Sequence, residues 1–278
     1  MTAVLPHRCG VERRAPRVGM LLLVVCGTVL AGSGCNPPMD GGGGSGPGHR
    51  QQSLGLSPED EYRLGVKAYR QILDEAREKD ALLPSDASAV RKVREIGKRI
   101  VKAVEIEPLR REINLHIEGY RFDWDFNVIR SRQVNAFCLP GGKVAVFTGL
   151  LRIVENEDQL ATVLAHEIAH ALAHHSNERL TREQTGQVGW LYNMAYDREQ
   201  ESEADHIGLF LMTFAGYDPD EALVFWQNMR RASQGGQLPE ILSNHPSDAH
   251  RINQLRAWIP QVKAGKDAYD HQRIAPAR

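Results

Sequence analysis

The chain has 278 residues, of which 42% are hydrophobic and 25% are charged, and its formal net charge is −1. This is the composition of an ordinary globular protein with one core, so it excludes a disordered chain and offers no basis for nucleic-acid binding. Of the four cysteines, two lie within the first 26 residues, so we expect no disulfide framework.

The N-terminal segment has the pattern of an export signal. Four arginines lie upstream of an apolar run at residues 20–31, which small residues and Cys35 follow. The run has about a dozen residues, whereas a helix that crosses a bilayer needs roughly 20. We therefore interpret residues 1–34 as a lipoprotein signal peptide, with an uncleaved membrane anchor as the alternative.

Ser33, Gly34 and Cys35 resemble the cleavage site of bacterial lipoproteins, which implies that a lipid on Cys35 holds the chain on a membrane. The resemblance predicts a lipoprotein of a bacterial cell envelope that faces the periplasm. Asn36 stands where some bacteria use Asp to retain lipoproteins at the inner membrane, and this favours the outer membrane. Residues 35–56 are rich in Gly, Pro and Ser and are expected to form a flexible tether.

Two helices and a small sheet are predicted in the first half of the folded domain. Apolar residues recur at helical spacing over residues 57–79, and a second helix is predicted at residues 85–104. Apolar and polar residues alternate in the segments that we expect to be half-buried strands, which are 113–117, 122–128, 134–139 and 143–148. Pro140, Gly141 and Gly142 predict a turn between the last two strands.

The second half of the domain is predicted to be helical. The expected helices lie at residues 157–179, 199–214, 219–231 and 247–258. The domain is placed at residues 57–262, and a polar C-terminal tail is expected at residues 263–278. The predicted fold class is α+β, mostly helical with a small β-sheet.

His166, Glu167 and His170 form an H-E-x-x-H pattern within the first of these helices. Histidines four residues apart project from one helix face, as two zinc ligands require, and Glu167 lies beside them. The flanking residues are apolar, so the helix is expected to lie in the core, where polar groups need a partner such as a metal. A pair of hydrogen-bonded core histidines is the alternative. His174 and His175 are interpreted as structural or surface residues, because either faces the metal only if the helix bends.

A second helix supplies carboxylates about 30 residues downstream. Glu201 and Asp205 share one face of it, whereas Glu203 does not and is interpreted as a surface or packing residue. Two histidines and a carboxylate with an open fourth position form a catalytic zinc site. A structural site built from thiolates is excluded, because Cys138 is the only cysteine in the predicted domain. We therefore predict one Zn²⁺ per chain.

Four motifs in the same order resemble a family of zinc peptidases that includes HtpX, BepA and the CAAX prenyl protease. They are residues 134–142, the H-E-x-x-H helix, residues 201–205, and residues 244–247 with 251–252. The resemblance implies a zincin-like fold in which Glu201 binds zinc and Asp205 orients a zinc-bound histidine. His245 matches a histidine that approaches the zinc in some relatives, and an ordinary turn histidine is the alternative.

The resemblance further implies that residues 135–142 contain an edge strand on which an extended substrate lies by main-chain pairing. Asn135, Ala136 and Phe137 are the predicted substrate-binding residues. Cys138 is interpreted as a packing residue and not as a nucleophile.

These features predict a membrane-tethered zinc metalloendopeptidase that hydrolyses misfolded or misassembled cell-envelope proteins, with Glu167 as the general base for the attacking water. His245 or Arg251 is expected to give a second interaction to the charge that develops on the substrate. The alternative is a chaperone or assembly factor of the same fold, with His245 over a rarely used protease site. A zinc-stabilised structural lipoprotein is a third possibility. The expected partners are unfolded proteins and, through lipidated Cys35, a membrane.

Overall fold

A computed structural model describes residues 50–183, 191, 195–234, 239–246 and 249–273. The described residues all belong to one compact unit, Asn36–Arg278, and none belongs to the other, Met1–Cys35. The expected signal peptide, Cys35 and most of the expected tether therefore lie outside the described residues.

The sheet has three strands, which are β1 (Asp125–Ile129), β2 (Ala136–Leu139) and β3 (Lys143–Phe147). Their order is β1-β3-β2, with β1 parallel and β2 antiparallel to the central β3. The turn between β2 and β3 needs its two glycines, because Gly141 and Gly142 have φ values of 76° and 78°. The small sheet predicted from the alternating segments is confirmed, and β2 is at its edge.

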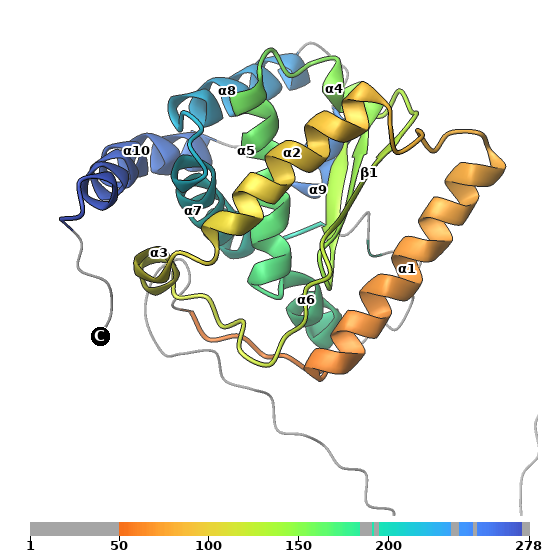
Figure 1. Cartoon of the computed structure of the whole chain (residues 1–278), viewed down its shortest axis with the longest axis horizontal. Helices are drawn as coiled ribbons and strands as arrows, with labels where there is room; N and C mark the ends of the chain where they lie inside the picture. The colour runs from red at the N-terminus through yellow and green to blue at the C-terminus, as the bar shows by residue number, and fades with distance from the viewer. Residues whose placement is uncertain (1–49, 184–190, 192–194, 235–238, 247–248, 274–278) are drawn as a thin grey trace, which may run out of the picture. The chain divides into compact units, whose positions relative to one another are not determined.

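Both faces of the sheet are covered, which explains why its strands are buried. Successive residues of β2 belong to two different apolar clusters: Ala136 and Cys138 pack with α2 (Ser88–Ala103) and α5 (Glu157–Leu172), whereas Phe137 and Leu139 pack with α1 (Pro58–Glu78). Figure 1 shows the sheet between α1 on one side and α2 with α5 on the other. The period of two in a strand thus separates the two clusters.

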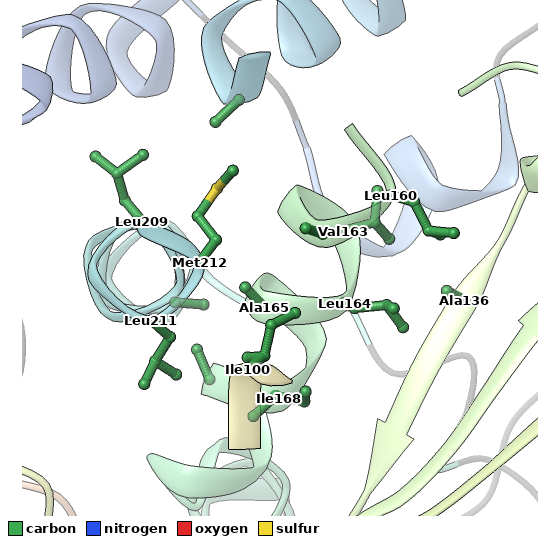
Figure 2. Packing of buried hydrophobic residues seen from close by; sticks show 14 of the residues in the cluster. Ile100, Ala136, Leu160, Val163, Leu164, Ala165, Ile168, Leu209, Leu211 and Met212 are labelled. Atoms are coloured by element: carbon green, nitrogen blue, oxygen red, sulfur yellow. The ribbon is translucent and has the colours of Figure 1, made fainter. Parts of the chain in front are cut away.

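The H-E-x-x-H helix α5 lies in the centre of the core, as predicted. Every residue from Gln159 to Leu172 is buried. Figure 2 shows Leu164 of α5 pointing toward Ala136 of β2, while α7 (Arg198–Phe214) lies on another side of α5. A Cβ at Gly208 would lie 3.0 Å from the backbone nitrogen of His166, so this glycine allows α7 to approach α5 closely.

The remaining helices surround this centre. They are α3 (Glu107–Glu112), α4 (Thr148–Leu151), α6 (His175–Glu183), α8 (Asp220–Gln234), α9 (Glu240–Asn244) and α10 (Ala249–Asp270). Local signals determine where two helices begin. Ser57 caps α1 by accepting a hydrogen bond from the amide of Asp60, and Asp197 caps α7 in a capping box with Gln200. None of the helices in the described ranges has the length and apolar stretch that a bilayer crossing requires.

Two predicted elements differ from the structure. The strand expected at residues 113–117 is wrong, because Asn114 has a φ of 45° and the segment runs along the core as an irregular chain. The single helix expected at residues 157–179 is broken, because α5 ends at Leu172 and His174 has a φ of 53° before α6 begins.

The two ends of the described chain are also more ordered than expected. Residues 50–56, placed in the flexible tether, contact α6: the amide of Leu56 donates to Oδ1 of Asn177 at 3.0 Å. Residues 263–270, placed in the polar tail, continue α10, where Lys263 contacts Asp220 at 2.6 Å. In both segments polar side chains pair with the folded domain, which composition alone does not reveal.

Candidate metal centre

Side chains from three separate places form a buried cluster. His166 and His170 lie one turn apart on α5, Glu201 lies in the first turn of α7, and His245 directly follows α9. One nitrogen or oxygen atom from each residue lies within 4.8 Å of the others. The structure thus brings together the three predicted ligands and places His245 among them.

The spacing of these atoms fits a zinc ion. Nε2 of His166 and Nε2 of His170 are 3.1 Å apart, and Oε1 of Glu201 is 3.4 Å from Nε2 of His170. Nδ1 of His245 lies 3.1 Å from Nε2 of His166 and 2.9 Å from Oε1 of Glu201. A tetrahedral zinc ion with bonds of about 2.0–2.1 Å holds its ligand atoms roughly 3.3 Å apart. Nitrogen and carboxylate ligands are also those that zinc prefers.

The charges of the cluster favour a cation. Burial lowers the pKa of His166, but hydrogen bonds and charges from Asp205 and Glu201 outweigh this and raise its pKa to about 9. Burial lowers the pKa of His170 well below its ordinary value, which keeps this histidine in the neutral form that binds metals. Burial raises the pKa of Glu201, but Arg251 and His245 outweigh this and hold it well below the usual range. Glu201 therefore stays ionised, and its carboxylate offers a negative charge to a metal ion.

Asp205 and Arg251 support the cluster from the side of α10. Oδ1 of Asp205 lies 3.0 Å from Nδ1 of His166, which orients the ring and leaves Nε2 for a metal. Arg251 donates to both oxygens of Asp205 at 2.7 Å, and its Nη1 lies 2.6 Å from Oε2 of Glu201. Arg251, one of two candidates for contacting the substrate, is buried and engaged with these carboxylates.

Glu167 lies between His245 and the edge of the sheet. Its Oε1 lies 3.3 Å from Nε2 of His245, and the backbone of Cys138 acts to lower its pKa. Among the described residues, Oε1 of Glu167 is buried without a hydrogen-bond partner. Burial raises the pKa of Glu167, against the charges of His245 and His166, which makes its carboxylate a stronger base.

The outer edge of β2 runs past this carboxylate. The amide of Phe147 donates to the carbonyl of Asn135, so by the alternation of an antiparallel pair Phe137 also pairs with β3. Ala136 and Cys138 therefore direct their main-chain groups to the outer edge. Of the three predicted substrate residues, only Ala136 presents its main chain there. Asn135 contributes its side chain, whose Oδ1 accepts from the amide of Ala136 at 3.0 Å.

Sequence reasoning missed part of the polar surroundings. His175 is buried and its Nδ1 lies 2.7 Å from Nδ1 of His170, because the break at His174 redirects it. Glu203, interpreted as a surface or packing residue, is buried and lies 3.0 Å from Nε2 of His175. The ring of Tyr196 stacks on His170, with centroids 3.9 Å apart. The helix break was the missing signal, because helical spacing alone directs His175 elsewhere.

Comparison with known proteins identifies the family. The model described as Peptidase family M48 matches residues 97–195 and 185–259. The mitochondrial metalloendopeptidase OMA1 of Schizosaccharomyces pombe is 34% identical over 243 residues, which cover 80% of this chain and 68% of that protein. The mitochondrial metalloendopeptidase OMA1 of Homo sapiens is 36% identical over 185 residues, which cover 54% of this chain and 35% of that protein.

The beta-barrel assembly-enhancing protease of Escherichia coli is 27% identical over 192 residues, which cover 55% of this chain and 39% of that protein. The resemblance to the zinc peptidase family is thus confirmed, through similarity to OMA1 and this protease.

These relatives overturn the predicted location. The expectation of a bacterial cell-envelope lipoprotein facing the periplasm is wrong, because the similar fungal, plant and animal proteins are mitochondrial. The export-like N-terminus on which it depended lies outside the described residues. The matched family nevertheless agrees with the structure. Its members are metallopeptidases, and the buried histidine and carboxylate cluster could hold the metal that this reaction needs. The chain belongs to peptidase family M48 and is a zinc metalloendopeptidase.

Proposed function

We propose that this chain hydrolyses internal peptide bonds of unfolded or misassembled proteins, with His166, His170 and Glu201 as the zinc ligands. The observation that carries the proposal is the position of Glu167. Its Oε1 lies 3.3 Å from Nε2 of His245 beside the proposed ligands, and the backbone of Cys138, on the strand edge that receives the substrate, acts on its pKa. The name of the Escherichia coli relative, an assembly-enhancing protease, supports misassembled proteins as the substrate class.

Glu167 is the general base of the proposed reaction. Bound zinc supplies a Lewis acid that lowers the pKa of water and polarises a carbonyl group. Glu167 takes the proton of the attacking water and returns it to the leaving nitrogen. Its burial and raised pKa suit both steps, because a base and acid work best when their pKa lies near the operating pH.

The substrate lies extended along the outer edge of β2. Main-chain pairing with Ala136 and Cys138 recognises an extended backbone and tolerates many side chains, which suits unfolded proteins. The amide of Ala136 is held by Oδ1 of Asn135, so an incoming strand must displace this side chain. The carbonyl of Val134, next along the edge, accepts from the amide of Ile241 in α9.

The position of His245 supports a second candidate function, that of a chaperone or assembly factor that cleaves its clients rarely. Its Nδ1 lies with the ligand atoms and its Nε2 lies beside Glu167, so in this conformation it covers the place where water and substrate must enter. The same segment also covers Val134 through Ile241. We propose that this conformation is quiescent and that α9 and His245 move aside for cleavage.

Cleavage of an unfolded protein such as casein by the full chain tests the proposal. We expect Glu167→Gln to keep its zinc and to lose at least about 100-fold in cleavage rate, because a positioned general base contributes roughly 10²–10⁴-fold. Glu199→Gln, which changes an exposed carboxylate on α7, should cleave like the unmodified chain. His245→Ala should cleave faster if the observed conformation is quiescent.

The outcomes separate the two candidates. Equal cleavage by the unmodified chain and Glu167→Gln would rule out Glu167 as the base. Zinc binding without cleavage by the unmodified chain and His245→Ala, together with suppressed aggregation of an unfolded client, would favour the chaperone. Zinc content is measured on each variant by metal analysis.

A further inference from the structure

A line of contacts leads away from the metal centre through His170, whereas Asp205 contacts the other histidine, His166. Nδ1 of His170 lies 2.7 Å from Nδ1 of His175, and Nε2 of His175 lies 3.0 Å from Oε2 of Glu203. Nε of Arg50 donates to the same oxygen of Glu203 at 2.5 Å. The side chains of His175 and Glu203 are 0% and 4% exposed, so these contacts are shielded from water.

The position of each proton in this line follows from the atoms at its two ends. A neutral His170 that offers Nε2 to zinc carries its proton on Nδ1, and that proton must point to Nδ1 of His175. Nδ1 of His175 therefore accepts this hydrogen bond, and the proton of the neutral His175 ring lies on its Nε2. Glu203 is acceptor-only when ionised, so it receives this proton, and Arg50 supplies the countercharge.

We propose that His175 and Glu203 are positioning residues that fix the proton of His170 on Nδ1 and keep its Nε2 free for zinc. A carboxylate usually does this by accepting directly from the ligand histidine, as Asp205 does for His166. Here a second imidazole carries the effect of the carboxylate to His170. The inference rests on the ligand set proposed above and adds a support that this set does not contain.

The break between α5 and α6 makes this line of contacts possible. In a continuous helix, a residue five positions on lies about 140° around the axis, so His175 would point away from His170. The positive φ of His174, 53°, ends α5 and turns His175 inward. Buried Glu61 holds His174 in this conformation by a contact of 2.9 Å to its Nδ1.

Residues just before α1 close the line at its outer end. Arg50 also contacts both oxygens of Glu178 on α6 at 2.5 Å, and Gln52 donates to the carbonyl of Ala173 at 2.7 Å. Oε2 of Glu203 lies 2.5 Å from Nε of Arg50 and 3.0 Å from Nε2 of His175, so one carboxylate oxygen faces both groups.

Glu203→Gln separates this role from packing, because it keeps the size of the side chain, removes its charge and replaces one acceptor oxygen with an N–H donor. The new amide can donate to Nε2 of His175, which places the proton of His175 on Nδ1 and against His170. His175→Phe removes the acceptor and keeps a ring. His175→Asn restores an acceptor, because the amide oxygen of Asn stands where Nδ1 of histidine stood.

The zinc dissociation constant of the full chain, measured by competition with a chromogenic chelator, tests the proposal. We expect Glu203→Gln and His175→Phe to raise it about 10–100-fold, the usual effect of losing a partner of a ligand histidine. His175→Asn should recover most of this loss. Arg50→Gln should raise the constant about threefold or more, since Glu203 keeps its hydrogen bond but loses the countercharge.

Two matched controls accompany these variants. Glu199→Gln changes an exposed carboxylate on the same helix as Glu203, and Arg182→Gln removes another arginine that contacts Glu178 but not Glu203. Both should bind zinc as the unmodified chain does. Circular dichroism checks that each variant is folded. If the Glu203 and His175 variants are not folded, the zinc dissociation constant of Arg50→Gln tests the proposal.

The proposal is overturned if folded Glu203→Gln and His175→Phe bind zinc as tightly as the unmodified chain, or if folded Arg50→Gln does so when the others fail to fold. It is also overturned if His175→Asn binds no better than His175→Phe. A wrong assignment of the zinc ligands would give a different result, because His170→Ala would then bind zinc as tightly as the unmodified chain.

Discussion

Glu178 shows how one buried carboxylate can be held by many donors. Arg50, Gln52, Arg182 and Gln200 all donate to it, at distances of 2.5–3.1 Å. Burial raises its pKa, but the hydrogen bonds and charge of Arg50, with help from the amides, outweigh this and lower the pKa to about 2. Residue 50 is thereby tied to α6 and to the first turn of α7.

This shift predicts a dependence of stability on pH. The pKa of Glu178 falls from about 4.5 in the unfolded chain to about 2 in the folded protein, so its contribution is complete above pH 4.5 and is lost as the pH falls toward 2. We expect Glu178→Gln to be less stable at pH 7 by on the order of 2 kcal/mol. This deficit should narrow as the pH falls from 5 to 3.

Urea unfolding at several pH values measures the deficit, with Glu199→Gln as the control for losing an exposed carboxylate. A deficit that stays constant between pH 5 and 3 would show that the stabilisation does not depend on the ionised form of Glu178.

At the residue scale, the sequence predicts side chains whose spacing along one helix is enough to bring them together. His166, Glu167 and His170 were found in this way, and the shared face of Glu201 and Asp205 was found on α7. His175 and Glu203 were missed because their contact depends on the break between α5 and α6 and joins residues 28 positions apart. Arg50 lies farther still, 153 positions from Glu203.

At the scale of elements, Gly65 determines how closely α1 approaches the sheet. A Cβ at this position would lie 1.9 Å from the carbonyl oxygen of Pro140, in the turn between β2 and β3. We expect Gly65→Ala to lower the free energy of unfolding by about 1–3 kcal/mol, as overpacking of a core usually does. The helix cannot relieve the clash without leaving the sheet.

Gly265→Ala is the matched control for this prediction. Gly265 lies within α10, and the nearest atom to its added Cβ is Cζ of Phe214 at 3.9 Å, an ordinary contact. This change should raise the free energy of unfolding by up to about 1 kcal/mol, since alanine favours helix over glycine. Urea unfolding compares the two variants, and changes of the same sign would contradict the steric account.

Helical periodicity and the alternation of strands predicted most elements correctly, because each pattern depends on a repeated apolar face. The segment at residues 113–117 shows where this reasoning stops. Its alternating apolar residues do face the core, but Asn114 with a φ of 45° prevents an extended strand. The five-residue helix α9 was missed because it is too short to show a period.

At the scale of the described domain, a zinc ion would connect α5, α7 and the residue after α9. A ligand that binds only the folded state stabilises it by about 2.7 kcal/mol at a free concentration 100 times its dissociation constant. We therefore expect a chelator to lower the unfolding temperature of the unmodified chain. His170→Ala, which lacks one proposed ligand, should show little or no change on adding the chelator.

Thermal unfolding followed by circular dichroism makes this comparison, with zinc content measured before and after chelation. An equal shift in both proteins would mean that the stabilising metal binds elsewhere. The sequence predicted that a metal holds these helices together, and the family resemblance implied that His245 approaches this metal. It did not predict α9, the short helix that ends directly before His245.

The distance between the ligands along the chain has a consequence for synthesis. His166 and His245 are 79 residues apart, and at about 5–20 residues per second a ribosome needs roughly 4–16 s to add that many. During this time α5 is made but its partners on α9 and α10 are not. A growing chain therefore has the H-E-x-x-H helix without the residues that complete and cover the cluster, so the zinc site cannot close until residue 245 has been made.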